Sequence, residues 1–240
     1  MEPAETIRNA VAAVSLLRVQ TAASPRLLDA VKQIKLFQAQ RFRATYADLL
    51  SSDDFGPATQ FFLDELYSDK DFEQRDVQFA KIAGALQTLF SKQVVQTAVT
   101  LAQLHKLTEE LDHQMGIAVL PASGVDEVAV YVQAWNTVGR RQDRRLQLET
   151  VLSVGLELQR LTRTPGLRLM LKMMRRPAHA AGLGALQGFL EAGFDTFAAM
   201  SGNKQLVASF LSTIEQRENK LIDALFSHAA AESEKYLRNL

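Results

Sequence analysis

The 240-residue sequence contains no cysteine and few residues that interrupt regular structure. The absence of cysteine excludes disulfides, thiolate zinc sites, iron–sulfur clusters and cysteine nucleophiles. Proline and glycine occur only 6 and 12 times, so long helices can continue without obligatory breaks. No stretch approaches the roughly 18 consecutive apolar residues of a membrane-spanning helix, so we expect no transmembrane segment.

The chain also lacks an excess of charge of either sign. It has 27 basic and 27 acidic residues, which gives a formal net charge of zero. A dedicated nucleic-acid-binding protein needs a surplus of lysine and arginine facing the phosphates, so nucleic acid is not an expected partner. The hydrophobic fraction of 47% is that of an ordinary globular protein.

The N-terminal sequence MEPAETIRNA has an early acidic residue. It lacks the basic segment and the apolar segment of a secretion signal. Together with the absence of cysteine, this favours a cytoplasmic location.

Apolar residues recur at helical spacing along most of the chain. Steps of three and four residues, or their sum, connect a series of apolar residues: Val94, Ala98, Leu101, Leu104, Leu111 and Met115. Only the β-branched run 128–132 allows a strand to be argued. With no linker, repeat or second hydrophobic pattern, the sequence predicts an all-α fold: one domain over 1–240, built as a bundle of about nine helices.

The segment 178–200 is predicted to be a central buried helix. It has a large apolar stripe that includes Leu186, Leu190 and Phe194, and residues 187, 191 and 195 leave only a narrow polar strip. A second stripe consists of small residues: Ala178, Ala181, Ala185, Gly188 and Ala192. Small residues in register favour tight packing against a neighbouring backbone. Alternatively, they leave room for a flat or apolar ligand.

Three of the four residues that could bind a metal share one side of a predicted helix. His105, Glu109 and His113 are four residues apart, and Glu110 and His113 form a Glu-x-x-His pair. A carboxylate-bridged di-iron site needs a second Glu-x-x-His and two further glutamates, and the sequence has no second copy. Charged pairs four residues apart on a solvated helix explain the pattern better, so we expect no metal and no cofactor.

Charge is segregated along the chain although the total is neutral. The segment 48–76 has nine acidic and two basic residues, and the segment 140–176 has ten basic and three acidic residues. We expect these blocks to pair with each other, within a monomer or across a dimer. The basic block could instead bind an anionic partner or a membrane surface. The predicted interaction surface consists of Arg140, Arg141, Arg144, Arg145, Arg168, Lys172, Arg175 and Arg176.

Two polar residues interrupt the apolar seam of the last predicted helix, 205–236. These are Glu218 and His228, among apolar residues such as Leu211, Leu221 and Leu225. A polar residue on a seam usually has a partner and fixes register or oligomeric state. We expect a basic side chain of the 140–176 block to pair with Glu218.

Two segments resemble a known family. Phe61-Phe62-Leu63-Asp64-Glu65-Leu66-Tyr67 continues into residues 70–76, and Met174-Arg175-Arg176-Pro177-Ala178 is followed by residues 181–183 and 189–191. Together, over about a fifth of the chain, they resemble an uncharacterised all-helical family of proteobacterial proteins. The resemblance implies a bacterial cytoplasmic setting and assigns no activity.

The sequence thus leads to three hypotheses of different classes. The first is a non-enzymatic helical interaction protein, a homodimer or a partner of another protein, that uses the charged surfaces. The second is a binder of a small apolar ligand or cofactor in a cavity beside the helix 178–200. The third is a metal-dependent, di-iron-like enzyme that uses His105, Glu109, Glu110 and His113.

Overall fold

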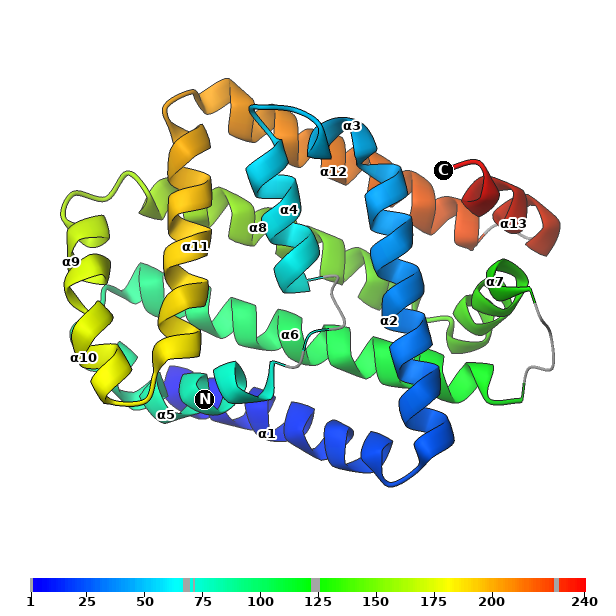
Figure 1. Cartoon of the computed structure of the whole chain (residues 1–240), viewed down its shortest axis with the longest axis horizontal. Coiled ribbons are helices and arrows are strands. Elements are labelled where there is room, and N and C mark those ends of the chain that lie inside the picture. The colour runs from blue at the N-terminus through cyan, green and yellow to red at the C-terminus, as the bar shows by residue number, and fades with distance from the viewer. Residues whose placement is uncertain (1, 67–69, 71, 122–125, 227–228) are drawn as a thin grey trace.

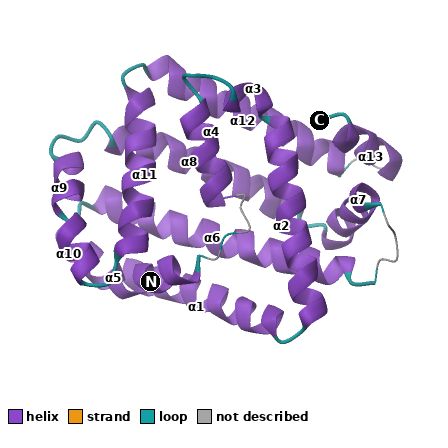
Figure 2. Cartoon of the chain, viewed as in Figure 1, coloured by secondary structure: helices purple, strands orange, loops and turns teal. Residues whose placement is uncertain are grey.

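The computed structural model describes residues 2–240 except 67–69, 71, 122–125 and 227–228; for residues 66, 201 and 204 it describes the backbone alone. Within these residues the regular structure is entirely helical (Figure 2). The helices are α1 (Pro3–Ala22), α2 (Pro25–Thr45), α3 (Ala47–Leu50), α4 (Gly56–Leu66), α5 (Glu73–Leu89), α6 (Lys92–Val119), α7 (Glu127–Val138), α8 (Arg141–Leu161), α9 (Leu167–Met173), α10 (Arg175–Ala180), α11 (Gly184–Ser201), α12 (Lys204–Leu225) and α13 (Ala230–Arg238).

The all-α prediction is confirmed, and the number of helices was underestimated. Nine of the described helices have 11 residues or more, and four shorter ones account for the difference from the predicted nine. The run 128–132 belongs to α7, because Asp126 caps the helix by accepting hydrogen bonds from the backbone N–H groups of Val128 and Ala129. Ser24 and Ser91 similarly cap α2 and α6.

The long helices form two crossing layers (Figure 1). In the first layer α1, α6, α8 and α12 run roughly side by side. In the second, α2, α4 and α11 cross them at a steep angle. The 28-residue helix α6 is the central element, because it packs against α1, α2, α5, α7 and α8.

The prediction of a central buried helix over 178–200 is wrong in two respects. Gly182 has φ = +73°, a left-handed conformation that glycine adopts readily, and it separates α10 from α11. The small-residue stripe also faces outward, since Ala181, Ala185, Gly188 and Ala192 are exposed. Helix α11 is thus an amphipathic helix of the outer layer, buried mainly through its large apolar residues.

The predicted last helix is also divided. Helix α12 ends at Leu225 and α13 begins at Ala230, so the seam does not continue to residue 236 in one helix. His228 lies outside the described residues. Ser233 donates a hydrogen bond to the carbonyl of Ala224 (2.7 Å), which connects α13 to the end of α12.

Buried apolar side chains form two clusters. The larger is centred on Phe42, Tyr46, Phe197 and Phe210. The smaller joins α1, α5 and α6 and includes Leu86. A space remains between the two clusters, and residues of α6 form part of its lining.

Candidate functional site

A mostly apolar cavity of about 190 Å³, here called the central cavity, lies between the two core clusters. Its lining includes Leu104 of the larger cluster, and Leu86, Ala98 and Ala102 of the smaller one. The volume exceeds the roughly 150 Å³ of an engineered apolar cavity that admits benzene. The space is therefore sufficient for a small organic molecule.

Aromatic and aliphatic side chains from α5, α8, α9 and α11 form most of the wall. Helix α11 contributes Leu186, Phe189, Leu190 and Phe194, and α9 contributes Leu167 and Leu171. Helix α9 has no buried residue, so it forms an outer wall only one helix thick.

Specific polar contacts hold α11 over the cavity. The buried side chain of Gln78, on α5, accepts a hydrogen bond from the backbone N–H of Leu186 (2.8 Å). Gln187 donates to the carbonyl of Leu171 on α9 (2.8 Å). The predicted polar strip of α11 therefore connects it to its neighbours.

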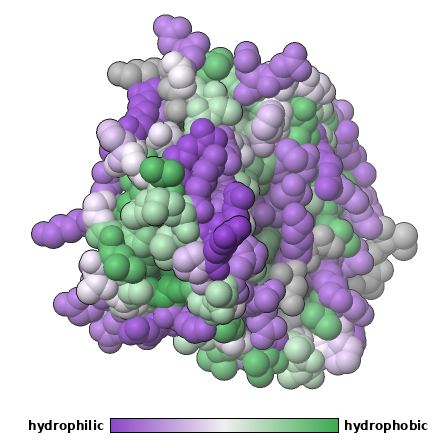
Figure 3. Space-filling model, turned by 60° about the vertical axis from the view of Figure 1, so that its left-hand side comes forward, coloured by the Kyte–Doolittle hydropathy of each residue, from purple (hydrophilic) through white to green (hydrophobic). Residues whose placement is uncertain are grey.

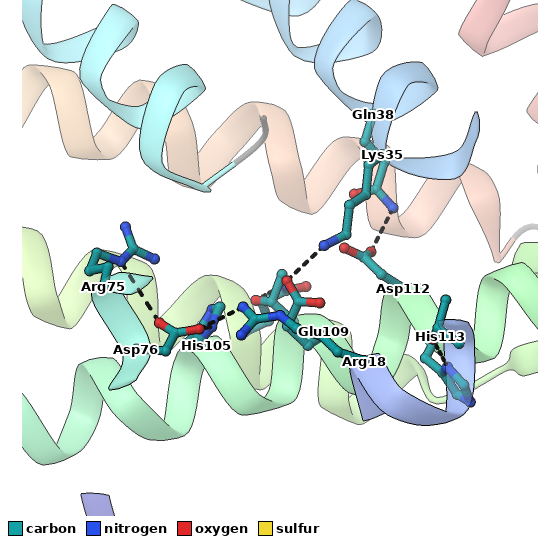
Figure 4. A network of polar contacts seen from close by, with 12 residues as sticks. Arg18, Lys35, Gln38, Arg75, Asp76, His105, Glu109, Asp112 and His113 are labelled. Atoms are coloured by element: carbon teal, nitrogen blue, oxygen red, sulfur yellow. Dashed lines mark hydrogen bonds and ion pairs between the residues drawn. The ribbon is translucent and has the colours of Figure 1, made fainter. Parts of the chain in front are cut away.

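A line of charged and polar side chains, here called the polar row, crosses one side of the cavity (Figure 4). It runs along α6 from α5 to α2. Its members are Arg18, Lys35, Gln38, Arg75, Asp76, His105, Glu109 and Asp112. All of these except Arg18 line the cavity.

Asp76 is the most highly connected residue of the row. Its Oδ2 atom lies 2.6 Å from an Arg18 guanidinium nitrogen and 2.8 Å from Nε2 of His105. Burial alone would raise the pKa of Asp76, but the hydrogen bonds and charges of His105 and Arg18 lower it below its usual value. An ionised carboxylate can only accept, so Nε2 of His105 is the donor; in the tautomer that is protonated at Nε2 alone, Nδ1 is an acceptor.

Arg75 occupies the end of the row nearest α11. It donates a hydrogen bond to Glu65 (2.7 Å), and its guanidinium carbon lies 3.9 Å from the ring centre of Phe72 and 4.6 Å from that of Phe189. Burial lowers the pKa of Arg75 and raises that of Glu65. The pair is thus partly withdrawn from water.

The other end of the row is formed by α2 and α6. Lys35 donates to Glu109 (2.7 Å), and Gln38 donates to Asp112 (3.0 Å). Burial alone would lower the pKa of Lys35, but Asp112 and Glu109 raise it above its usual value. Burial raises the pKa of Asp112, which favours its uncharged form.

A smaller cavity of about 50 Å³, here called the arginine cavity, adjoins the central one. Both are lined by Gln38, Leu104 and Thr108, and the smaller is also lined by Arg41, Arg144 and Glu218. Glu218 accepts hydrogen bonds from Arg41 (2.5 Å) and from the hydroxyl of Tyr46 (2.8 Å). The expected partner from the 140–176 block is therefore replaced by Arg41 of α2.

Comparison with known proteins places the chain in a family. A family model described as "Domain of unknown function (DUF8198)" matches residues 17–232. The chain belongs to this family. The match includes all of the residues that line the two cavities except Val11, and it confirms that the resemblance read from the sequence is to an uncharacterised family. Searches of the curated proteins and of the solved structures found no significant match.

In this family member, the four residues considered for a metal site have separate partners. His105 contacts Asp76, Glu109 contacts Lys35, and Glu110 contacts Lys106 (3.3 Å). The Nδ1 atom of His113 lies 2.8 Å from the hydroxyl of Thr21. Over the described part of the chain, no three histidine or acidic side chains are grouped as metal ligands would be.

The predicted interaction surface is divided among several places. Arg144 is only 6% exposed, and its guanidinium carbon lies 4.2 Å from the ring centre of Trp135. The prediction that Arg144 belongs to an exposed surface is therefore wrong, because its side chain is buried against an aromatic ring. Arg140 pairs with Asp143. Arg141 and Arg145 both pair with Asp223.

The remaining bases lie on α9 and α10. Arg168 pairs with Asp195 (2.7 Å) and Arg175 with Glu191 (2.5 Å), both on α11. Lys172 and Arg176 are exposed. These ion pairs connect part of the basic block to α11. In the acidic block, Asp48 pairs with Arg217 of α12.

Sequence analysis found His105 and Glu109 but placed them on a solvated helix face rather than at a cavity, and it missed Lys35, Asp76 and Asp112. A usable signal was present on α6, where Asp112 follows His105 and Glu109 on the same helical side at steps of four and three. The partners come from α1, α2 and α5, and only the tertiary structure brings these helices together.

Proposed function

We propose that this protein binds a small, largely apolar ligand in the central cavity. The observation that carries the proposal is the apolar space of about 190 Å³ between two packed core clusters. A bound apolar molecule would remove this apolar lining from water, which is worth roughly 25 cal/mol per Å² of apolar surface buried.

The lining indicates the kind of ligand. Phe79, Phe90, Phe189 and Phe194 present rings to the cavity, which suits a planar or compact hydrocarbon body. The polar row offers hydrogen bonds on one side only. Ligand pockets commonly combine such an apolar wall with a few polar groups that orient the ligand.

Calorimetric titration with 2-naphthalenemethanol tests the proposal. For about 12 non-hydrogen atoms at roughly 0.5 kcal/mol each, we expect a dissociation constant on the order of 10–100 µM. Ala102→Phe places a ring in the cavity and is expected to abolish binding. Ala185→Phe, on the exposed side of α11, is the matched control and should bind as the wild type does. Absence of binding by the wild type overturns the proposal.

We also propose, as a second candidate, that two copies associate through the outer face of α9 and α11. Leu169 and Met173 on α9 are 63% and 69% exposed, and Ala185 and Gly188 on the adjoining α11 are also exposed. Apolar surface gathers left of centre in Figure 3, on the side of the molecule where α9 and α10 lie. Exposed large apolar side chains in a patch are typical of interaction sites.

Sedimentation velocity tests this second candidate. The wild type is expected to sediment as a dimer, and the Leu169→Glu, Met173→Glu double variant as a monomer. Val19→Glu, at an equally exposed position on α1, should leave the dimer unchanged. A monomeric wild type at high concentration overturns the candidate.

The last part of the proposal concerns where the protein is located in the cell. Among the residues that the structure describes, no helix combines the length and apolar character of a membrane span. We retain as proposals a bacterial, cytoplasmic protein without enzymatic activity or cofactor. Cell fractionation with an antibody against the chain tests the location.

A further inference from the structure

The ion pairs of the polar row restrict the head group that a ligand can carry. Each charged side chain that lines the central cavity among the described residues already has a polar partner there. Lys35 binds Glu109, and Arg75 binds Glu65. Asp76 is bound by Arg18 from behind the cavity wall.

Among the described residues, the row therefore offers a ligand no charged side chain that is still without a partner. Arg75 is paired with the adjoining Glu65, Lys35 with Glu109, and Arg18 and His105 with Asp76. Asp112 accepts a hydrogen bond from the Gln38 amide, and burial raises its pKa. A charged head group added to this row would be desolvated without a counter-ion, which is expensive in a buried site.

Two partially used hydrogen-bonding groups remain on α6. His105 uses Nε2 for Asp76, which leaves Nδ1 as an acceptor. The Thr108 hydroxyl accepts a hydrogen bond from Gln147 (2.8 Å), which leaves its own proton to donate. His105 and Thr108 are three residues apart, so they lie on the same side of the helix, and both line the cavity.

We propose that the ligand of the central cavity has an uncharged hydroxyl head, which donates a hydrogen bond to His105 and accepts one from Thr108. This inference rests on the proposed function and narrows it to apolar alcohols. Fatty acids and amines of the same size should bind more weakly, because each charged side chain of the row already has a partner. A hydroxyl can donate and accept at once, as this pair of groups requires.

The test compares four probes with one naphthalene body at about pH 7. These are 2-naphthalenemethanol, 2-naphthoate, 2-naphthylmethylammonium and 2-methylnaphthalene. We expect the alcohol to bind at least about tenfold more tightly than either charged probe. If no probe binds, the proposed function fails. If a charged probe binds as well as the alcohol, the cavity stands and the hydroxyl assignment is overturned.

Thr108→Val supplies a variant of nearly the same shape that leaves Asp76 and its partners in place. The variant should weaken binding of the alcohol by about three- to tenfold and leave binding of 2-methylnaphthalene unchanged. Equal weakening of both probes would show a change of packing only and would overturn the role of Thr108. Unchanged binding of both would overturn it as well.

Discussion

At the scale of single residues, the buried surroundings of Asp112 oppose the ionisation of its carboxyl group. Asp112 lies on the central helix α6 and is 4% exposed. Its described hydrogen bond comes from the neutral side-chain amide of Gln38. Burial raises its pKa above the usual 3.8. The folded state therefore retains the proton at a pH at which the unfolded chain has lost it.

We predict a pH-dependent effect of Asp112→Asn. Because the folded pKa is raised, the wild type loses stability as pH rises from about 3.8 to the folded pKa, by at most about 1.4 kcal/mol per pH unit. The variant lacks this loss, so its stability relative to the wild type should increase with pH. Urea unfolding followed by circular dichroism at about pH 4 and about pH 8 measures the difference.

Asp223→Asn is the control with the opposite sign. The hydrogen bond from Arg141 lowers the pKa of this exposed carboxyl. The ionised carboxylate therefore stabilises the wild type at pH values above the usual pKa, and this stabilisation is lost as pH falls through the folded pKa. A constant difference between Asp112→Asn and the wild type at both pH values would contradict the assignment of Asp112.

The Arg41–Glu218 pair makes a second prediction at this scale. Both side chains are buried, so Glu218→Leu leaves a guanidinium without its counter-ion and should cost about 3–5 kcal/mol of unfolding free energy. The double variant Arg41→Met, Glu218→Leu should lose less than Glu218→Leu alone. Urea unfolding of the three proteins measures this, and a double variant with the summed loss would contradict it.

At the scale of elements, α2 and α6 approach each other most closely at Gly116. A β-carbon at this position would lie 2.4 Å from a methyl carbon of Val31 and 3.3 Å from the Val31 backbone nitrogen. Gly116→Ala should therefore destabilise the protein by about 1–3 kcal/mol, despite the higher helix propensity of alanine. Thermal and urea unfolding provide the measurement.

Gly188→Ala is the matched control within α11. A β-carbon there meets nothing within 4 Å, and the position is exposed. This change should stabilise the protein by about 0.5–1 kcal/mol through helix propensity alone. If both variants shift stability in the same direction and by the same amount, the close approach at Gly116 has no energetic consequence.

Periodicity predicted the long helices well and their ends less well. Helix α6 was predicted because its apolar residues recur on one side over many turns. The break at Gly182 was missed because an isolated glycine within a helical pattern does not by itself end a helix. The outward stripe of α11 was misread since alanine and glycine fit a tight contact and a solvent-exposed face equally well.

At the scale of the whole molecule, the central cavity results from how the helices are arranged. Most of its lining comes from α5, α6, α8, α9 and α11, which are spread over more than half of the sequence, and α1, α2 and α4 contribute further residues. The sequence therefore allowed the hypothesis of a cavity beside 178–200 but not its position, because no local pattern records a space between two core clusters. Two members of the basic block, Arg168 and Arg175, likewise pair with Asp195 and Glu191 of α11, which lie outside both charge blocks.

The most direct test of the account is a methyl NMR titration of the wild type with 2-naphthalenemethanol. We predict that the methyl signals of Leu86, Leu161 and Leu190, which line the central cavity, shift as the ring occupies it. Signals of Val207 and Leu225, buried elsewhere in the larger cluster, should remain in place. Shifts confined to surface methyl groups, or no shifts at a saturating concentration, would contradict the account.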